Sequence, residues 1–223
     1  MADVQFLDFV RGPFLKFAIL FFFLGISYRI IRILVKGIPK DKAKPRGNVP
    51  LNIIKMPILK PIYEWQFPDV FSKKAIIYIA GFTFHIGFLG VTFLIPQHAF
   101  LWKEIIGIEP IYFSGMLAHI LAYATVLSLI ILWLARIFDP VLRLLTGIDE
   151  HIANFLILAT IATGILATQW VGGSTYITML SIHILFASIL IIYIPFSRLA
   201  HFIDYFFATA FYGRDVGKKG VSM

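Results

Sequence analysis

The chain has 223 residues and a formal net charge of +8, and 59% of its residues are hydrophobic while only 14% are charged. A soluble domain has about a quarter charged residues, so the composition excludes an ordinary soluble protein and places most of the chain in lipid. The sequence holds no cysteine, which excludes disulfides, Fe–S clusters bound by this chain alone and covalent c-type haem attachment.

Five apolar segments follow one another along the chain, each about the 20 residues that a transmembrane helix needs. They cover residues 14–35, 75–95, 111–134, 152–171 and 176–196. We therefore expect an all-α membrane protein, a single domain over residues 1–223 folded as a bundle of five transmembrane helices. The first segment lacks the pattern of a cleavable signal peptide, so we keep it as a span.

A basic loop over residues 36–74 separates the first two spans. Six prolines are spaced through it, at Pro39, Pro45, Pro50, Pro57, Pro61 and Pro68. Because proline removes a backbone donor and clashes with the preceding helical turn, we expect an extended segment here rather than a helix.

The distribution of Lys and Arg predicts the topology. All but three of the 20 fall on one side of the predicted bundle, and the exceptions are Arg11, Lys16 and Lys103. By the positive-inside rule the N-terminus is outside, and the C-terminus and the basic loop are cytoplasmic, in a prokaryotic inner membrane. The basic stretches would also suit nucleic acid or anionic lipid, but we interpret them as topology signals, with membrane lipid and no nucleic acid as partners.

The last segment carries two histidines that share a helix face. His183 and His201 are eighteen residues apart. At about 100° per residue this is five full turns, and at about 1.5 Å per residue it is roughly 27 Å, close to the thickness of the hydrocarbon core. Pro195 lies between them, so this register is approximate.

The second segment supplies two more histidines at matched depths. Because it runs antiparallel to the last segment, His98 pairs with His183 near the outside, and His85 pairs with His201 near the inside. A lone membrane histidine is most often structural, but two bis-histidine sites across a bilayer are what two b-type haems require. We therefore predict these four histidines as iron ligands.

The outer ligand has an alternative. His85 and His98 are thirteen residues apart, which leaves their rings about 140° apart on an ideal helix. A bend or helix end at Pro96 would turn His98 back, and we favour this arrangement. His119, in the outer half of the third segment, is the alternative ligand, and His151 is interpreted as a surface residue.

Other candidate cofactor-binding residues surround these histidines. Gly81, Gly87 and Gly90 would let a flat macrocycle approach the second helix, although close packing of membrane helices selects glycine equally well. Arg198 precedes His201 by three residues and would pair with a haem propionate, or serve only as a positive-inside anchor. The set is completed by two arginines near the inner end of the first segment, Arg29 and Arg32.

Three stretches resemble the respiratory nitrate reductase gamma subunit family. PFSRLAH (195–201), preceded by His183, resembles that family's last helix, FHIGFLG (84–90) its second helix, and TGIDEHIANFLILATIATGIL (146–166) its fourth. The resemblance covers the whole bundle, and PFSRLAH is its specific part. It implies a dihaem cytochrome b that takes electrons from quinol near the outer face and passes them inward to Fe–S proteins.

The family also includes membrane subunits of sulfate-reducer redox complexes. Their partners are heterodisulfide-reductase-like Fe–S proteins or periplasmic multihaem cytochromes c. The long basic segment after the first span and the short connection before the fifth look closer to these relatives. The lysine that nitrate reductase uses for quinol has no counterpart at IEPIYF (108–113), where Lys103 is the candidate substitute.

These observations predict the quinone-reactive, electron-carrying subunit of a respiratory oxidoreductase complex. Menaquinol would bind near His98, where Lys103 or Glu104 would assist its proton, and electrons would leave to a cytoplasmic Fe–S partner. Alternatively, both residues belong to a solvated loop, or electrons flow from a periplasmic multihaem cytochrome c to the quinone pool or the cytoplasmic partner. Two rival classes are a histidine-lined proton or metal transporter and a membrane anchor with structural histidines.

Overall fold

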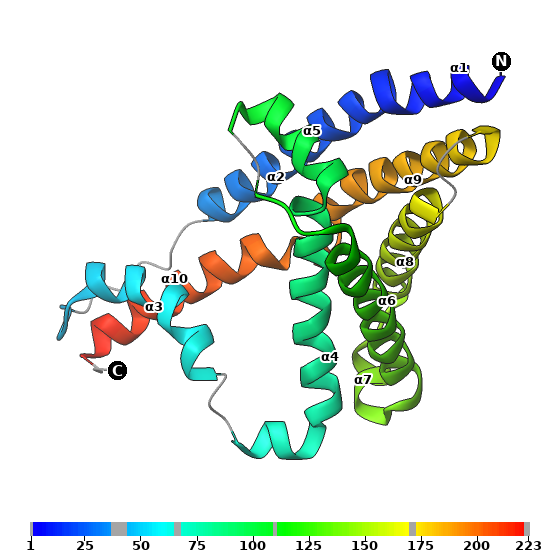
Figure 1. The fold of residues 1–223 in the computed structure, drawn as a ribbon. Coiled ribbons are helices and arrows are strands. Elements are labelled where there is room, and N and C mark those ends of the chain that lie inside the picture. The colour runs from blue at the N-terminus through cyan, green and yellow to red at the C-terminus, as the bar shows by residue number, and fades with distance from the viewer. Residues whose placement is uncertain (1, 37–43, 65–67, 109–110, 170–172, 221–223) are drawn as a thin grey trace. The chain divides into compact units, whose positions relative to one another are not determined.

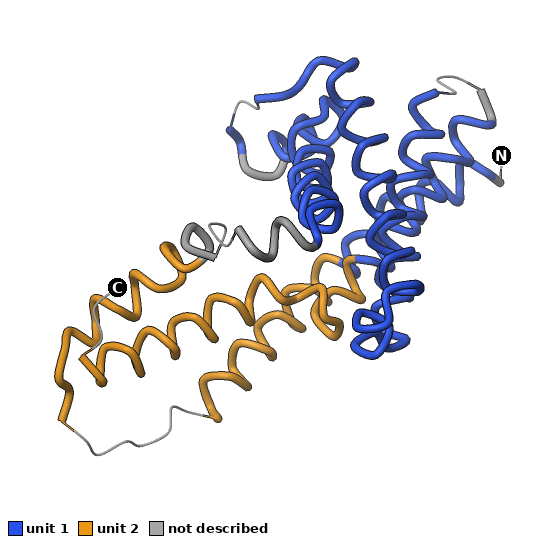
Figure 2. Tube along the Cα trace, turned by 90° about the horizontal axis from the view of Figure 1, so that it is seen from below, with its two compact units in different colours: residues 1–18, 73–190 blue, residues 19–72, 191–223 orange. Residues whose placement is uncertain are grey.

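The computed structural model describes residues 2–36, 44–64, 68–108, 111–169 and 173–220. Every regular element within these ranges is helical, which confirms the all-α fold class (Figure 1). The chain divides into two compact units (Figure 2). The first unit consists of residues 1–18 and 73–190, the second of residues 19–72 and 191–223, and each is described by itself.

Five helices of the described chain are long and apolar enough to cross a membrane. They are Asp3–Lys36, Lys74–Phe93, Gly115–Phe138, Ile148–Gln169 and Thr175–Phe196. Each overlaps one of the predicted segments, so the prediction of five helices with the length and polarity of membrane spans is confirmed. The third span begins later than predicted because Ser114 caps it, its side chain accepting a hydrogen bond from the Leu117 backbone.

The first unit contains most of the helical bundle. It comprises α1 (Ala2–Phe9), a π-helical turn (Val10–Phe14), α4 (Pro68–Phe93), α5 (Pro96–Ile106), α6 (Gly115–Phe138), α7 (Pro140–Leu145), α8 (Ile148–Gln169) and most of α9 (Gly173–Tyr193). Helix α4 packs against α6, α6 against α8, and α8 against α9. Helices consecutive in the bundle are therefore neighbours in space, as expected for short connections.

A sharp corner separates α4 from α5. Helix α4 ends at Phe93, Ile95 is extended (φ −82°, ψ 147°), and Pro96 begins α5. Proline suits the first turn of a helix because that position needs no intrahelical donor. The predicted helix end before His98 is therefore observed, and it places His98 in the first turn of a separate helix.

The second unit contains the rest of α2 (Leu15–Lys36), α3 (Val49–Glu64), two short 3₁₀ turns (Ile194–Phe196 and Arg198–Ala200) and α10 (His201–Lys219). Helix α3 packs along α10 at very close range, because two glycines of α10 face it. A Cβ added to Gly217 would lie 2.9 Å from Val49 Cα, and one on Gly213 would overlap the Asn52 carbonyl. The Arg46 amide donates to the Lys218 carbonyl (3.0 Å) and ties the start of this helix pair.

The prediction of an extended proline-rich loop was wrong over α3. Pro50 lies in the first turn of this helix, where proline is tolerated, but Pro57 and Pro61 are inside it. Packing against α10 buries Met56 almost completely, and this burial offsets the backbone hydrogen bonds that the prolines cannot donate. Residues 37–43 and 65–67 of the loop lie outside the described residues.

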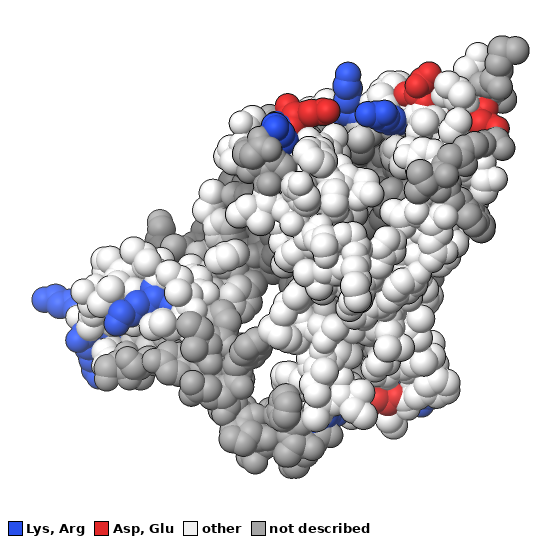
Figure 3. Space-filling model, viewed as in Figure 1, with Lys and Arg blue, Asp and Glu red and all other residues white. Residues whose placement is uncertain are grey.

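Charged side chains avoid the middle of the first unit. In Figure 3 they gather near its two ends, with an uncharged band between them on the visible face. At one end Lys74 and Asp139 form an ion pair of 3.0 Å, which joins the start of the second span to the α6–α7 corner. Such a band matches a hydrocarbon layer, in which exposed charge is costly.

Candidate functional site

His183 is held on α9 by the facing surface of α8. Its Nδ1 donates to the Thr160 carbonyl (2.8 Å). A Cβ added to Gly164, one turn further along α8, would lie 3.0 Å from His183 Cε1. Because the ring occupies the space that any larger residue would need, Gly164 and the Thr160 carbonyl together fix the imidazole.

His98 is fixed by the corner between α4 and α5. Its Nδ1 donates to the Val91 carbonyl in the last turn of α4 (2.7 Å). Burial lowers the pKa of His98, against the opposing effect of its backbone hydrogen bonds. The neutral imidazole is the form that binds a metal ion, so this environment suits a ligand.

The two rings lie together in the first unit. The centroids of His98 and His183 are 6.0 Å apart and their planes differ by 10°. Two imidazoles on opposite sides of one metal ion, with metal–nitrogen bonds of about 2 Å, have centroids about 6 Å apart. Each Nδ1 is held by a backbone carbonyl, which leaves Nε2 as the ligand nitrogen, a usual arrangement for metal-binding histidine.

Trp102 shares the His98 face of α5, whereas the two predicted quinone residues do not. Trp102 follows His98 by one turn, and its Nε1 donates to the Thr92 carbonyl (3.1 Å). Lys103 and Glu104 are exposed, and at about 100° per residue they lie on other faces of the helix. The structure therefore places them near His98 in the chain but directs them away from its ring.

His85 and its neighbours occupy two faces of α4. His85 is exposed, and its Nδ1 donates to the Gly81 carbonyl (2.7 Å). A Cβ on Gly81 would meet nothing within 4 Å, so this face is open. Gly87 instead faces α6, where a Cβ would overlap the Thr125 hydroxyl, and Gly90 faces Leu121 of the same helix. Gly87 is therefore required by the close packing of α4 on α6, and Gly90 lies in the same helix contact, as the alternative interpretation of these glycines predicts.

His201 begins α10 in the second unit. Its Nδ1 donates to the carbonyl of Arg198 (3.2 Å), and both residues are exposed. His85 and His201, the predicted inner ligands, share one feature with His98 and His183, since each Nδ1 is held by a backbone carbonyl. His85 belongs to the first unit and His201 to the second, so their pairing stays a prediction.

Arg29 contacts other parts of the second unit. Its guanidinium binds both carboxylate oxygens of Asp204 and the carbonyls of Pro195 and Ser197. These contacts join the guanidinium to the chain itself, and the prediction that Arg29 binds a cofactor stays a prediction. Arg32, one turn later on α2, is exposed.

The remaining histidines are engaged with other side chains. His119 contacts the Gly115 carbonyl through Nδ1 (2.7 Å) and the Thr168 hydroxyl through Nε2 (3.2 Å). His151 accepts a hydrogen bond from Trp133 Nε1 (2.9 Å). Of the two candidate partners for His183, the structure brings His98 beside it and directs both ring nitrogens of His119 elsewhere.

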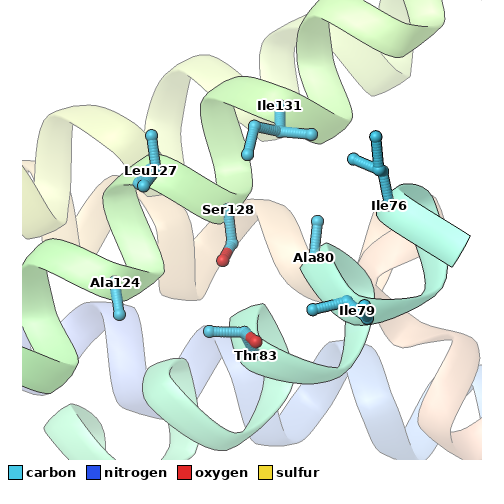
Figure 4. Close-up of a pocket in the computed structure, with 8 residues that line it drawn as sticks. All are labelled: Ile76, Ile79, Ala80, Thr83, Ala124, Leu127, Ser128 and Ile131. Carbon is cyan, nitrogen blue, oxygen red and sulfur yellow. The ribbon is translucent and has the colours of Figure 1, made fainter.

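A cavity of about 300 Å³ lies between α4 and α6 (Figure 4). Apolar side chains line it, with the hydroxyls of Thr83 and Ser128 as its polar groups. Its lining residues come from the Lys74 half of α4 and from the middle and second half of α6, and none of the candidate ligands is among them.

Sequence reasoning did not single out Thr160 and Gly164, which contact His183, or Asp204, which pairs with Arg29. Gly164 and Thr160 are one turn apart on α8, a spacing of small residues that signals close helix contact. This spacing predicts a packing face but does not say which side chain will meet it. Asp204 had a weaker signal, an acidic residue one turn after His201 on the same helix.

Comparison with known proteins finds a similarity over most of the chain. A protein of Nitratidesulfovibrio vulgaris (strain Hildenborough) is 27% identical over 219 residues, which cover 95% of this chain and 93% of that protein. No family model matches the chain. No solved structure matches it. The likeness to the Nitratidesulfovibrio vulgaris protein therefore extends over both units and all five spans.

Proposed function

We propose that this chain is a membrane cytochrome b subunit of a respiratory redox complex. It carries electrons through two b-type haems between menaquinol near the outer face and a cytoplasmic Fe–S partner subunit. The reverse flow, from a periplasmic multihaem cytochrome c to the quinone pool or to the cytoplasmic partner, uses the same bundle. The observation that carries the proposal is the His98–His183 pair.

The donor set fits haem iron better than a bare metal ion. Structural zinc takes four protein ligands, whereas haem iron takes four nitrogens from the porphyrin and can be held by as few as one or two protein ligands. The ring separation of 6.0 Å and the two anchored Nδ1 atoms suit this bis-imidazole arrangement. Bound haem supplies one-electron oxidation and reduction, and the chain supplies its ligands and an apolar surrounding that tunes the redox potential.

The inner site of the proposal uses His85 and His201. Both are anchored through Nδ1, and the open face beside Gly81 provides room for a macrocycle next to His85. Arg198, three residues before His201, is the candidate for a propionate contact at this site, and Arg32 is a further candidate.

The quinol site of the proposal lies by α5. The positive-inside pattern puts α5 and Lys103 on the outer side, so protons from quinol would be released there. Trp102 shares the His98 face and offers an aromatic surface, while Lys103 or Glu104 would assist the transfer of the quinol proton. Replacing Glu104 by Gln should slow quinol oxidation without changing haem content.

Haem content and optical spectra test the proposal directly. The full chain, co-expressed with its partner subunits, should contain two haems and show the sharp reduced absorbance of bis-imidazole haem. His98→Ala and His183→Ala should each remove one haem and stop quinol oxidation. His119→Ala is the matched control and should retain both, because its ring nitrogens contact Gly115 and Thr168 instead.

Each other outcome decides against a part of the proposal. A colourless wild-type protein overturns it, and metal binding by that protein would favour the transporter class. Two haems in the His183→Ala variant would leave the ring pair structural. Loss of haem from His119→Ala alone would make His119 the outer ligand.

A further inference from the structure

The chain breaks its helix immediately before His201. Helix α9 ends at Tyr193, and two 3₁₀ turns separated by the extended Ser197 (φ −109°, ψ 176°) lead into α10. Pro195 lies in the first turn and is buried. Because regular helical bonding is interrupted here, the carbonyls of this corner take other donors, and the direction in which α10 leaves the corner depends on them.

Helix α2 supplies a matching surface for this corner. A Cβ on Gly25 would lie 2.6 Å from Pro195 Cβ, so only glycine lets the proline seat there. One turn later, Arg29 Nη1 donates to the carbonyls of Pro195 (2.9 Å) and Ser197 (3.2 Å). Gly25 and Arg29 therefore share one face of α2 and hold the break from the N-terminal side of His201.

The same guanidinium also holds the chain on the C-terminal side of His201. Arg29 Nε donates to Asp204 Oδ1 (3.0 Å) and Nη2 to Oδ2, which makes a two-pronged ion pair. Asp204 lies in the first turn of α10. Since a planar guanidinium fixes the direction as well as the distance of its partners, Arg29 orients the first turn of α10.

We propose that Arg29 and Asp204 are positioning residues for the His201 imidazole. They clamp the backbone before and after His201, and thereby set the direction in which Nε2 meets its metal. This inference rests on the proposed function for the ligand role of His201, whereas the clamp itself is a property of the chain. Lysine cannot replace Arg29, because a single ammonium lacks the fork that bonds carbonyls and carboxylate together.

Two measurements on the full-length protein test this inference. Arg29→Gln and Asp204→Asn should raise hydrogen exchange at amides 197–206 at least tenfold. In a redox titration and in the low-spin haem signals of electron paramagnetic resonance, one of the two haems should shift or be lost while the other is unchanged. Arg29→Lys should behave like Arg29→Gln, and the double variant Arg29→Gln/Asp204→Asn should be no worse than either single one.

Lys36→Gln is the matched control, since Lys36 is an exposed basic residue on the same helix. It should change neither measurement. Unchanged exchange in both Arg29→Gln and Asp204→Asn overturns the clamp. Faster exchange with both haem signals unmoved overturns the positioning role and leaves a structural ion pair. A wild-type protein without haem overturns the proposed function, and the exchange measurement still decides the clamp separately.

Discussion

His183 and His201 lie on consecutive stretches of the chain, yet they are held in different ways. His183 is fixed inside the first unit by the close approach of two helices, with Gly164 leaving room for the ring and a carbonyl of α8 receiving Nδ1. His201 stands at a helix break in the second unit, flanked on both sides by contacts of one arginine. A close helix contact and one backbone carbonyl hold the first ring, whereas the polar contacts of Arg29 hold the backbone on both sides of the second.

The difference has a physical cause. Within a continuous membrane helix the backbone is already bonded, so small residues and shape complementarity suffice to fix a neighbour. At a break the backbone carbonyls and the new helix start require partners, and a charged fork satisfies several at once. Substitutions that act on one kind of contact should therefore leave the other histidine unaffected.

We expect the largest effect from a substitution that disturbs the packing around His183. In Gly164→Leu the new Cβ alone would lie 3.0 Å from His183 Cε1, and the rest of the side chain needs still more space, so the ring must move. Overpacking of this kind costs about 1–3 kcal/mol. The haem of the His98–His183 pair should be lost, while the signal assigned to His201 persists in the reduced spectrum. Gly115→Ala is the control, because a Cβ there meets nothing within 4 Å. Two intact haems in Gly164→Leu would contradict the packing account.

We expect an intermediate effect from a substitution beside His98, the ring that lies next to His183. Trp102→Phe keeps the ring contact with Phe93 but removes the bond to the Thr92 carbonyl, which ties α5 to the end of α4. Losing such a bond costs about 1 kcal/mol. We expect a shifted midpoint potential for the outer haem only, with both haems still present. Equal shifts in both haems would show that α5 does not act on His98 alone.

The smallest effect tests a polar contact away from both histidines. The Leu142 amide, followed by the Lys74 ammonium, lowers the pKa of Asp139 below its ordinary value of 3.8. A lowered folded-state pKa means that the stabilisation is present above pH 3.8 and is lost as the pH falls through the lower value. Asp139→Asn should therefore flatten the acid side of a plot of unfolding temperature against pH, without changing haem content. Asp8→Asn, at an exposed carboxylate, should leave that plot unchanged.

The sequence pattern predicted the features that depend only on neighbouring residues. The five spans follow from runs of apolar residues, and the helix end before His98 follows from Pro96. The prolines led to a wrong prediction of extended chain over Val49–Glu64. This segment is a helix because it is stabilised by contacts with glycines more than 150 residues later in the chain. Propensity is a weak guide wherever long-range packing outweighs it.

The sequence by itself determined how many helices cross the membrane, because the length and polarity of a segment decide whether lipid accepts it. The predicted common helix face of His183 and His201 is wrong, because the helix that carries His183 ends at Tyr193 and His201 begins another helix. Only the tertiary structure decided that His98 rather than His119 lies beside His183, and that Arg29 meets Asp204 across 175 residues. Such contacts depend on how separate helices pack, which no spacing along the chain specifies.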